Sequence, residues 1–187
     1  MRKTALILSI VFILTGCASA QSKVDYLSPL RPEFFVQPNG NDHWRLAEPF
    51  RFQVDGRSWE APRGMWTDFA SVPRFLWAVI SPYELGCGPI AHDAGYRHKW
   101  ESKEYWDKVF LACMERDGIP AWKREAAYYA VVWFGQSAWE RPAPPANLSR
   151  NKSMPMDGLR RGTAKDIGDQ AARWINFVRL QTREVQP

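Results

Sequence analysis

The chain has 187 residues, 45% of them hydrophobic and 14% aromatic, which is enough to bury a core and excludes an intrinsically disordered protein. Its net charge of +5 comes without a basic run or a recognised binding motif, so we expect no nucleic-acid partner. Its ten tryptophans suit either a core short of aliphatic side chains, which we favour, or a surface that meets lipid.

The N-terminus has the pattern of a secretory signal. A basic dipeptide precedes an apolar run over residues 5–14 that is too short to span a bilayer stably. Leu14-Thr15-Gly16-Cys17 follows and resembles a bacterial lipobox. The resemblance implies cleavage after residue 16 and lipidation of Cys17. Ala18 then favours sorting to the outer membrane, where the domain would face the periplasm. An ordinary signal peptide or an uncleaved anchor is the alternative.

We expect five parts in the chain. Residues 1–16 form the signal peptide, and removing them lowers the net charge from +5 to +3. Residues 17–41 are polar and broken by prolines, which predicts a tether that becomes ordered near residues 34–36. A globular domain over 42–140 follows, then a Pro-rich linker over 141–163. Residues 164–187 form a C-terminal helix and tail, and the helix either docks on the body, which we favour, or lies on the membrane.

The globular domain begins with strand patterns. Apolar and polar residues alternate over 50–54, Asp55-Gly56 is a turn signal, and residues 58–61 offer a partner strand. With a further strand at 44–46, these predict a small antiparallel hairpin or meander. A loop then leads to a short helix over 72–80, and on local evidence Asp68 in this loop is expected to form an Asx-turn or a cap.

Two short antiparallel helices are predicted next, and they carry the candidate chemistry. The first runs over residues 89–100 and places His92 and Tyr96 on one face, with Asp93 about a quarter-turn away. Ser102 is the expected N-cap of the second, which contains Asp107 and ends at Gly118. His92 and Asp107 then lie level and are placed to share a hydrogen bond. The alternative is that Asp107 caps a helix or pairs with an arginine.

A third helix is expected from residue 120 to about 139. Gly135 is placed to kink it or to allow close packing. Its predicted inward stripe consists of Trp122, Ala126, Tyr129, Ala130 and Trp133.

Cys87 and Cys113 remain once Cys17 is lipidated. They lie at matching positions about the helical hairpin, and an exported chain enters an oxidising compartment. A disulfide between them is favoured over two buried free thiols.

Residues 61–139 resemble a family known as Domain of Unknown Function 1353, found in bacteria and their phages. The motifs that carry the resemblance are T-D-F-A-S-V-P-R at 67–74, A-H-D-x-x-Y-R at 91–97 with its histidine at His92, and a following D-x-x-F at 107–110. The resemblance names no activity.

The same helices are also similar to the core of bacterial secreted phospholipase A2. Carried over residue by residue, that resemblance makes His92 the general base on water. Asp107 orients His92, and Tyr96 braces Asp107.

The phospholipase resemblance further implies calcium. Asp93 becomes one ligand, and the T-D-x-x-S-x-P pattern at 67–73 makes Asp68 and the carbonyl near Phe69 others. Calcium takes six to eight oxygens, which these groups and waters begin to supply. The chain departs from the family in the shorter spacing between His92 and Asp107, and the hairpin and C-terminal helix have no counterpart there. A shortened or closed groove would leave the scaffold without turnover.

The sequence therefore predicts an α+β protein with a three-helix phospholipase A2-like core, a small antiparallel hairpin or meander and a C-terminal helix. The leading function is calcium-dependent hydrolysis of phospholipid or related esters by an envelope lipoprotein. The alternative is a non-catalytic, prophage-related envelope lipoprotein that binds a partner protein or excludes an incoming phage.

Overall fold

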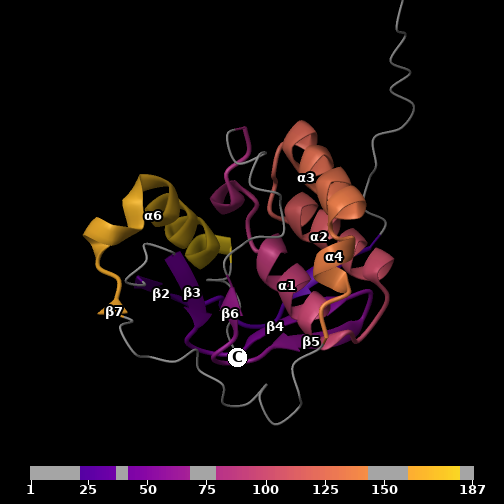
Figure 1. Ribbon diagram of the computed structural model, residues 1–187, viewed down its shortest axis with the longest axis horizontal. Coiled ribbons are helices and arrows are strands. Elements are labelled where there is room, and N and C mark those ends of the chain that lie inside the picture. Colours follow the sequence, from indigo (N-terminus) through magenta and orange to yellow (C-terminus); the bar gives the residue numbers. More distant parts are fainter. Residues whose placement is uncertain (1–21, 37–41, 68–78, 143–159, 182–187) are drawn as a thin grey trace, which may run out of the picture.

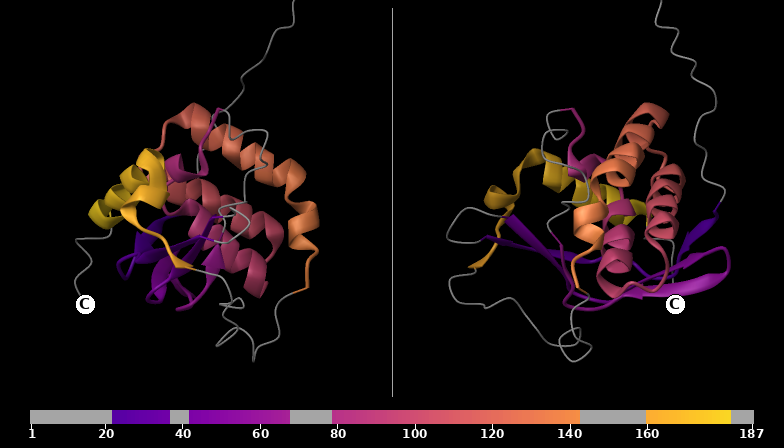
Figure 2. Two further views of the ribbon diagram at one scale, coloured as in Figure 1. Left: turned by 60° about the vertical axis from the view of Figure 1, so that its left-hand side comes forward. Right: turned by 45° about the vertical axis from the view of Figure 1, so that its right-hand side comes forward.

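The fold is mixed α+β, with helices on one side and strands on the other (Figures 1 and 2). This computed structural model describes residues 22–36, 42–67, 79–142 and 160–181. Helices α1 to α4 lie over a sheet of order β1-β4-β5, and α6 lies over a sheet of order β6-β3-β2-β7. The signal peptide, Cys17 and residues 72–78 of the predicted helix fall outside the described residues, and residues 79–80, its predicted end, form a turn and a bend.

The β1-β4-β5 sheet contains the predicted hairpin. Strands β4 (Phe50–Val54) and β5 (Arg57–Ala61) pair antiparallel, and Asp55 and Gly56 between them both have positive φ. Two successive residues of positive φ make a turn whose twist matches that of the strands it joins. The turn prediction is confirmed, and β1 (Val24–Tyr26) completes the sheet on the other side of β4.

The second sheet uses segments that the sequence assigned to tether and linker. Strand β2 (Pro32–Val36) pairs with β3 (Asp42–Leu46), and β7 (Arg160–Arg161) pairs with β2. Strand β6 (Trp66–Thr67) forms the other edge. The ordered body therefore starts by residue 24, which shortens the predicted tether, and β3 belongs to a different sheet from β4.

Helices α1 (Gly88–His98) and α2 (Lys103–Arg116) form the predicted hairpin. The Tyr105 backbone N–H donates to Ser102 Oγ at 3.2 Å, which confirms Ser102 as the N-cap of α2. Gly118 has φ +71° and follows the end of α2, as a helix-terminating glycine does. Local capping signals thus set the bounds of the helices that carry the candidate site.

The third predicted helix is divided. Helix α3 (Ala121–Phe134) ends at Gly135, and α4 (Gln136–Trp139) follows. The predicted inward stripe is wrong except for Ala130, because Trp122, Ala126, Tyr129 and Trp133 are exposed. The buried residues of α3 are the smaller Ala127, Ala130 and Val131.

The C-terminal helix docks on the body, as predicted. Helix α6 (Ala164–Gln181) buries Ala171, Trp174 and Val178, and Trp174 Nε1 donates to the carbonyl of Gly86 at 2.9 Å. Trp44, Trp106 and Trp174 are all buried in the core. The preference for a tryptophan-rich core therefore holds for these three residues. No helix in the described part of the chain is long and apolar enough to cross a membrane.

A buried carboxylate ties the start of α1 to the sheet. Asp117 accepts hydrogen bonds from Tyr26 Oη at 3.0 Å and from the Cys87 backbone N–H at 2.7 Å. Burial raises the pKa of Asp117 above its usual value, although these two hydrogen bonds act to lower it. The contacts join β1 to the loop before α1 and fix where the first site helix begins.

Candidate functional site

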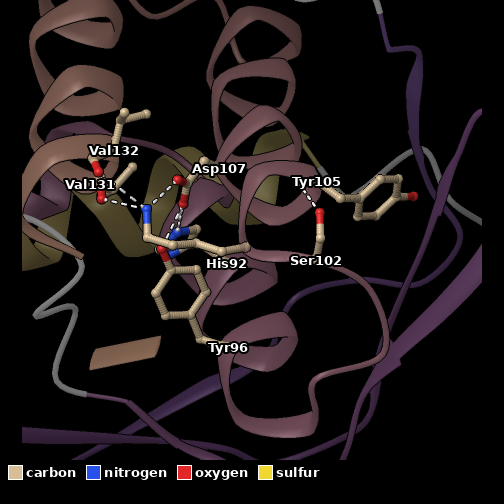
Figure 3. A network of polar contacts seen from close by, with 8 residues as sticks. His92, Tyr96, Ser102, Tyr105, Asp107, Val131 and Val132 are labelled. Carbon is tan, nitrogen blue, oxygen red and sulfur yellow. Dashed lines mark hydrogen bonds and ion pairs between the residues drawn. The ribbon is translucent and has the colours of Figure 1, made fainter. Parts of the chain in front are cut away.

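The structure brings His92, Tyr96 and Asp107 together. His92 Nε2 lies 3.1 Å from Asp107 Oδ1, and Tyr96 Oη donates to the same oxygen at 2.6 Å (Figure 3). His92 is 2% exposed, and its ring packs against those of Tyr96 and Phe110 with centroids 4.0 and 5.1 Å away. The contact expected between His92 and Asp107 is therefore present in a buried setting.

Lys103 also binds Asp107, a contact that was not predicted from the sequence. Its Nζ donates to Asp107 Oδ2 at 2.7 Å and to the carbonyls of Val131 and Val132 at 3.1 and 3.3 Å. Lys103 is buried, and the carbonyls it contacts belong to the last turns of α3 (Figure 3). The cationic partner of Asp107 is thus a lysine four residues earlier on the same helix. The sequence does contain a signal for this contact, because Lys103 and Asp107 carry opposite charges and are four positions apart on one helix.

These contacts hold Asp107 in its charged form. Burial alone raises the pKa of Asp107, but hydrogen bonds from His92, Lys103 and Tyr96 outweigh it and keep the pKa below the usual value. Because an ionised carboxylate only accepts hydrogen bonds, His92 Nε2 is the donor to Asp107, and the neutral tautomer with this proton has its lone pair on Nδ1. Burial, followed by the hydrogen bond to Asp107, raises the pKa of Tyr96, which stays a donor.

Two glycines allow the helices to approach one another here. A Cβ on Gly95 of α1 would lie 1.9 Å from Cδ2 of Trp106 on α2, so only glycine permits this spacing. A Cβ on Gly135 would lie 2.8 Å from Tyr96 Oη and 2.3 Å from the carbonyl oxygen of Val131. The absence of a side chain at Gly135 therefore permits the junction of α3 and α4 to pack closely on Tyr96.

The expected calcium ligands are only partly described. Asp93 lies on α1, and its Oδ2 accepts a hydrogen bond from Thr67 Oγ1 at the end of β6. Asp68 and Phe69 lie outside the described residues. Within the described ranges, no group of three or more His, Cys, Asp and Glu side chains is placed to hold a metal ion. The described residues alone supply too few oxygen ligands for calcium, which takes about six to eight.

Cys87 and Cys113 are both fully buried and are present as free thiols. The disulfide that the sequence favoured is not formed here, and the alternative of two buried thiols describes the structure. Burial raises the pKa of both thiols, with Asp117 adding to the effect. Such thiols are poorly reactive while the protein is folded.

Comparisons with known proteins give no activity. A relative from Sinorhizobium fredii (strain NBRC 101917 / NGR234), "Uncharacterized protein y4jT", is 27% identical over 128 residues. The alignment covers 66% of this chain and 38% of that protein, so the chain spans well under two thirds of the relative's length. No solved structure matches the chain. Residues 44–131, which include most of β3, all of β4 to β6, α1 and α2, and most of α3, match the model of the family described as "Protein of unknown function (DUF1353)".

Proposed function

We propose that the chain is a lipid-anchored envelope protein that hydrolyses phospholipid or related esters at His92. The supporting observation is the buried hydrogen bond between His92 Nε2 and Asp107 Oδ1, with Tyr96 on the same oxygen. It is the arrangement expected from the phospholipase A2-like helical core, whose His92 and Asp107 helices correspond to α1 and α2.

The proposed reaction uses the second nitrogen of His92. Nδ1 takes a proton from water while the water oxygen attacks the ester carbonyl carbon. The tetrahedral intermediate collapses with cleavage of the ester C–O bond, and the proton on Nδ1 passes to the leaving alkoxide. Asp107 fixes the ring and stabilises the imidazolium formed in between. Neither Tyr96 nor Lys103 exchanges a proton in this scheme.

A second candidate is a non-catalytic envelope lipoprotein, related to prophage proteins, that binds a partner or excludes a phage. Two observations favour it: His92 is only 2% exposed, and Lys103 balances the charge of Asp107. A carboxylate already paired with a cation stabilises an imidazolium less strongly. Only the first candidate function involves ester hydrolysis, so an assay of phospholipid hydrolysis distinguishes the two.

Replacing His92 with glutamine is expected to abolish hydrolysis. General-base catalysis typically contributes about 10²–10⁴-fold, so turnover of a fluorogenic phospholipid should fall at least a hundredfold. The matched control is His98→Gln, which changes a half-buried histidine on the same helix and should leave turnover unchanged. Equal turnover by wild type and His92→Gln, or none in either, would move the assignment to the binding module.

We also propose that Asp68, the Phe69 carbonyl and Asp93 bind calcium. The proton transfers at His92 do not involve the ion. We expect millimolar calcium to raise the unfolding temperature, since a ligand at a hundredfold excess over Kd stabilises by about 2.7 kcal/mol. Asp93→Asn should remove most of the shift, whereas Asp25→Asn, a surface aspartate on β1, should retain it. An identical shift in Asp93→Asn and wild type would exclude Asp93 as a ligand.

Lipidation is tested at Cys17. Because the thiol carries the first acyl chain, Cys17→Ser should leave the chain unprocessed and free of labelled fatty acid. The proposed location at the outer membrane, facing the periplasm, is checked by fractionating cells that express the wild type. Normal acyl labelling of Cys17→Ser would rule out the lipoprotein proposal.

A further inference from the structure

The outward side of α3 carries an unusual aromatic surface. Trp122, Ala126, Tyr129 and Trp133 recur at intervals of four, three and four residues, so they share one exposed side of the helix, with Phe134 beside them. Trp122 and Trp133 are 55% and 69% exposed, and the rings of Tyr129 and Trp133 stack 5.5 Å apart. We call this set the α3 aromatic face. Contiguous exposed apolar surface of this kind marks a site of interaction.

The two cations of α3, Lys123 and Arg124, pair with carboxylates of neighbouring elements. Lys123 Nζ pairs with Glu84 at 2.8 Å, and Arg124 pairs with Glu115 at 3.3 Å. Arg124 is therefore drawn toward α2, whereas Lys123 Nζ also lies 5.3 Å from the centroid of the Trp122 ring, at the edge of the face. The four residues of the stripe carry no charge, which removes the main cost of entering an apolar phase.

We propose that the α3 aromatic face lies in the interface of the phospholipid bilayer to which the chain is anchored; this rests on the proposed anchor at Cys17. Tryptophan and tyrosine favour the headgroup level of bilayers, because their rings are apolar and their N–H and O–H groups are polar. Helix α3 itself lies on the side of the helical layer that is remote from the strands (Figure 2).

The length of the tether fits this arrangement. Cys17 precedes β1 by about seven residues, which span at most about 25 Å when extended. Strand β1 packs on α2, and α2 packs on α3, so the outer side of α3 is about two helix diameters, or about 20 Å, from β1. An anchored chain can therefore lay α3 on the membrane surface that holds Cys17.

The arrangement would also place the candidate site near its proposed substrate. The carbonyls of Val131 and Val132 on α3 accept hydrogen bonds from Lys103, which pairs with Asp107. His92 would thus lie one helix below the bilayer surface. A phospholipid ester reaching it would need to move only about a helix diameter, roughly 10 Å, out of the membrane.

The test places a fluorescent label at one position of the full acylated chain in vesicles of phosphatidylethanolamine and phosphatidylglycerol. Trp133→Cys carries the label on the α3 aromatic face. Leu180→Cys is the matched control, since Leu180 is an apolar residue of α6 that is 64% exposed. Cys87 and Cys113 are buried and do not compete for the reagent. We expect the label at position 133 to shift to shorter wavelength and to be quenched by nitroxide-labelled lipid, with neither change at position 180.

Three results would overturn the proposal. The first is no quenching at position 133, and the second is equal quenching at positions 133 and 180. The third is a shift at position 133 that depends on protein density but not on quencher lipid, which would indicate a second copy or another protein on α3. Fatty-acid labelling tests the acylation of Cys17 independently of the position of α3. Quenching at position 133 in a chain without acyl groups would keep the α3 proposal and end the lipoprotein proposal.

Discussion

Replacing Asp107 with asparagine is expected to destabilise the domain by about 3–5 kcal/mol, the usual loss when one partner of a buried ion pair is removed. The change leaves Lys103 as a buried cation beside a neutral amide, and it weakens the hydrogen bonds from His92 and Tyr96. For a chain of this length the unfolding temperature should fall by roughly 6–20 °C. Thermal and urea unfolding of the purified protein measure the loss.

The double variant Lys103→Met/Asp107→Asn shows how much of this loss comes from leaving the Lys103 ammonium buried without its carboxylate. It removes the uncompensated charge, so it should recover much of the stability that Asp107→Asn loses. Glu60→Gln is the surface control, because the Arg51–Glu60 pair is exposed and such pairs contribute about 0–1 kcal/mol. If Asp107→Asn loses no more stability than Glu60→Gln, the buried contacts of Asp107 contribute no more than an exposed ion pair.

The same pair predicts a pH dependence with a definite sign. The pKa of Asp107 is lower in the folded state than its usual value, so the unfolded chain binds its proton more readily. Its contribution to stability is present above the unfolded pKa of about 3.9 and is lost as the pH falls toward the folded pKa. The difference in stability between wild type and Asp107→Asn should therefore shrink below about pH 4.

Much of the site was predictable because local signals determine it. Ser102 caps α2 and Gly118 ends it, and these bounds fix the register that sets His92 opposite Asp107. Helical spacing likewise places Tyr96 on the same side of α1 as His92. These predictions needed only periodicity and capping chemistry.

The features that escaped prediction depend on tertiary packing. Lysine is rarely buried, and Lys103 is satisfied in its buried position by Asp107 together with two carbonyls at the end of α3, a distant segment of the chain. Strands β1 and β2 are short segments near prolines whose partners lie further along the chain. In α3 two sides are apolar, and periodicity does not say that the one with smaller residues faces inward.

Gly95→Ala is expected to damage both stability and the candidate site. The new Cβ would lie within 1.9–2.4 Å of three atoms of the Trp106 indole, a separation that real structures do not tolerate. Trp106 is fully buried and packs against the rings of Phe52, Trp59 and Trp100, so its indole has no room to move. The helices must separate instead, and overpacking of this kind costs about 1–3 kcal/mol or more.

That cost exceeds the helix propensity gained by alanine over glycine, which is at most about 1 kcal/mol. Separating α1 from α2 would also draw Tyr96 and His92 away from Asp107, since these residues neighbour the clash on each helix. Turnover should therefore fall along with stability, although no reacting group is changed. Trp106→Phe supplies the compensating space, so Gly95→Ala/Trp106→Phe should lose less stability than the two single losses combined. Wild-type stability in Gly95→Ala would show that the α1–α2 spacing does not require glycine, and strictly additive losses in the double variant would show that Trp106 is not the obstacle.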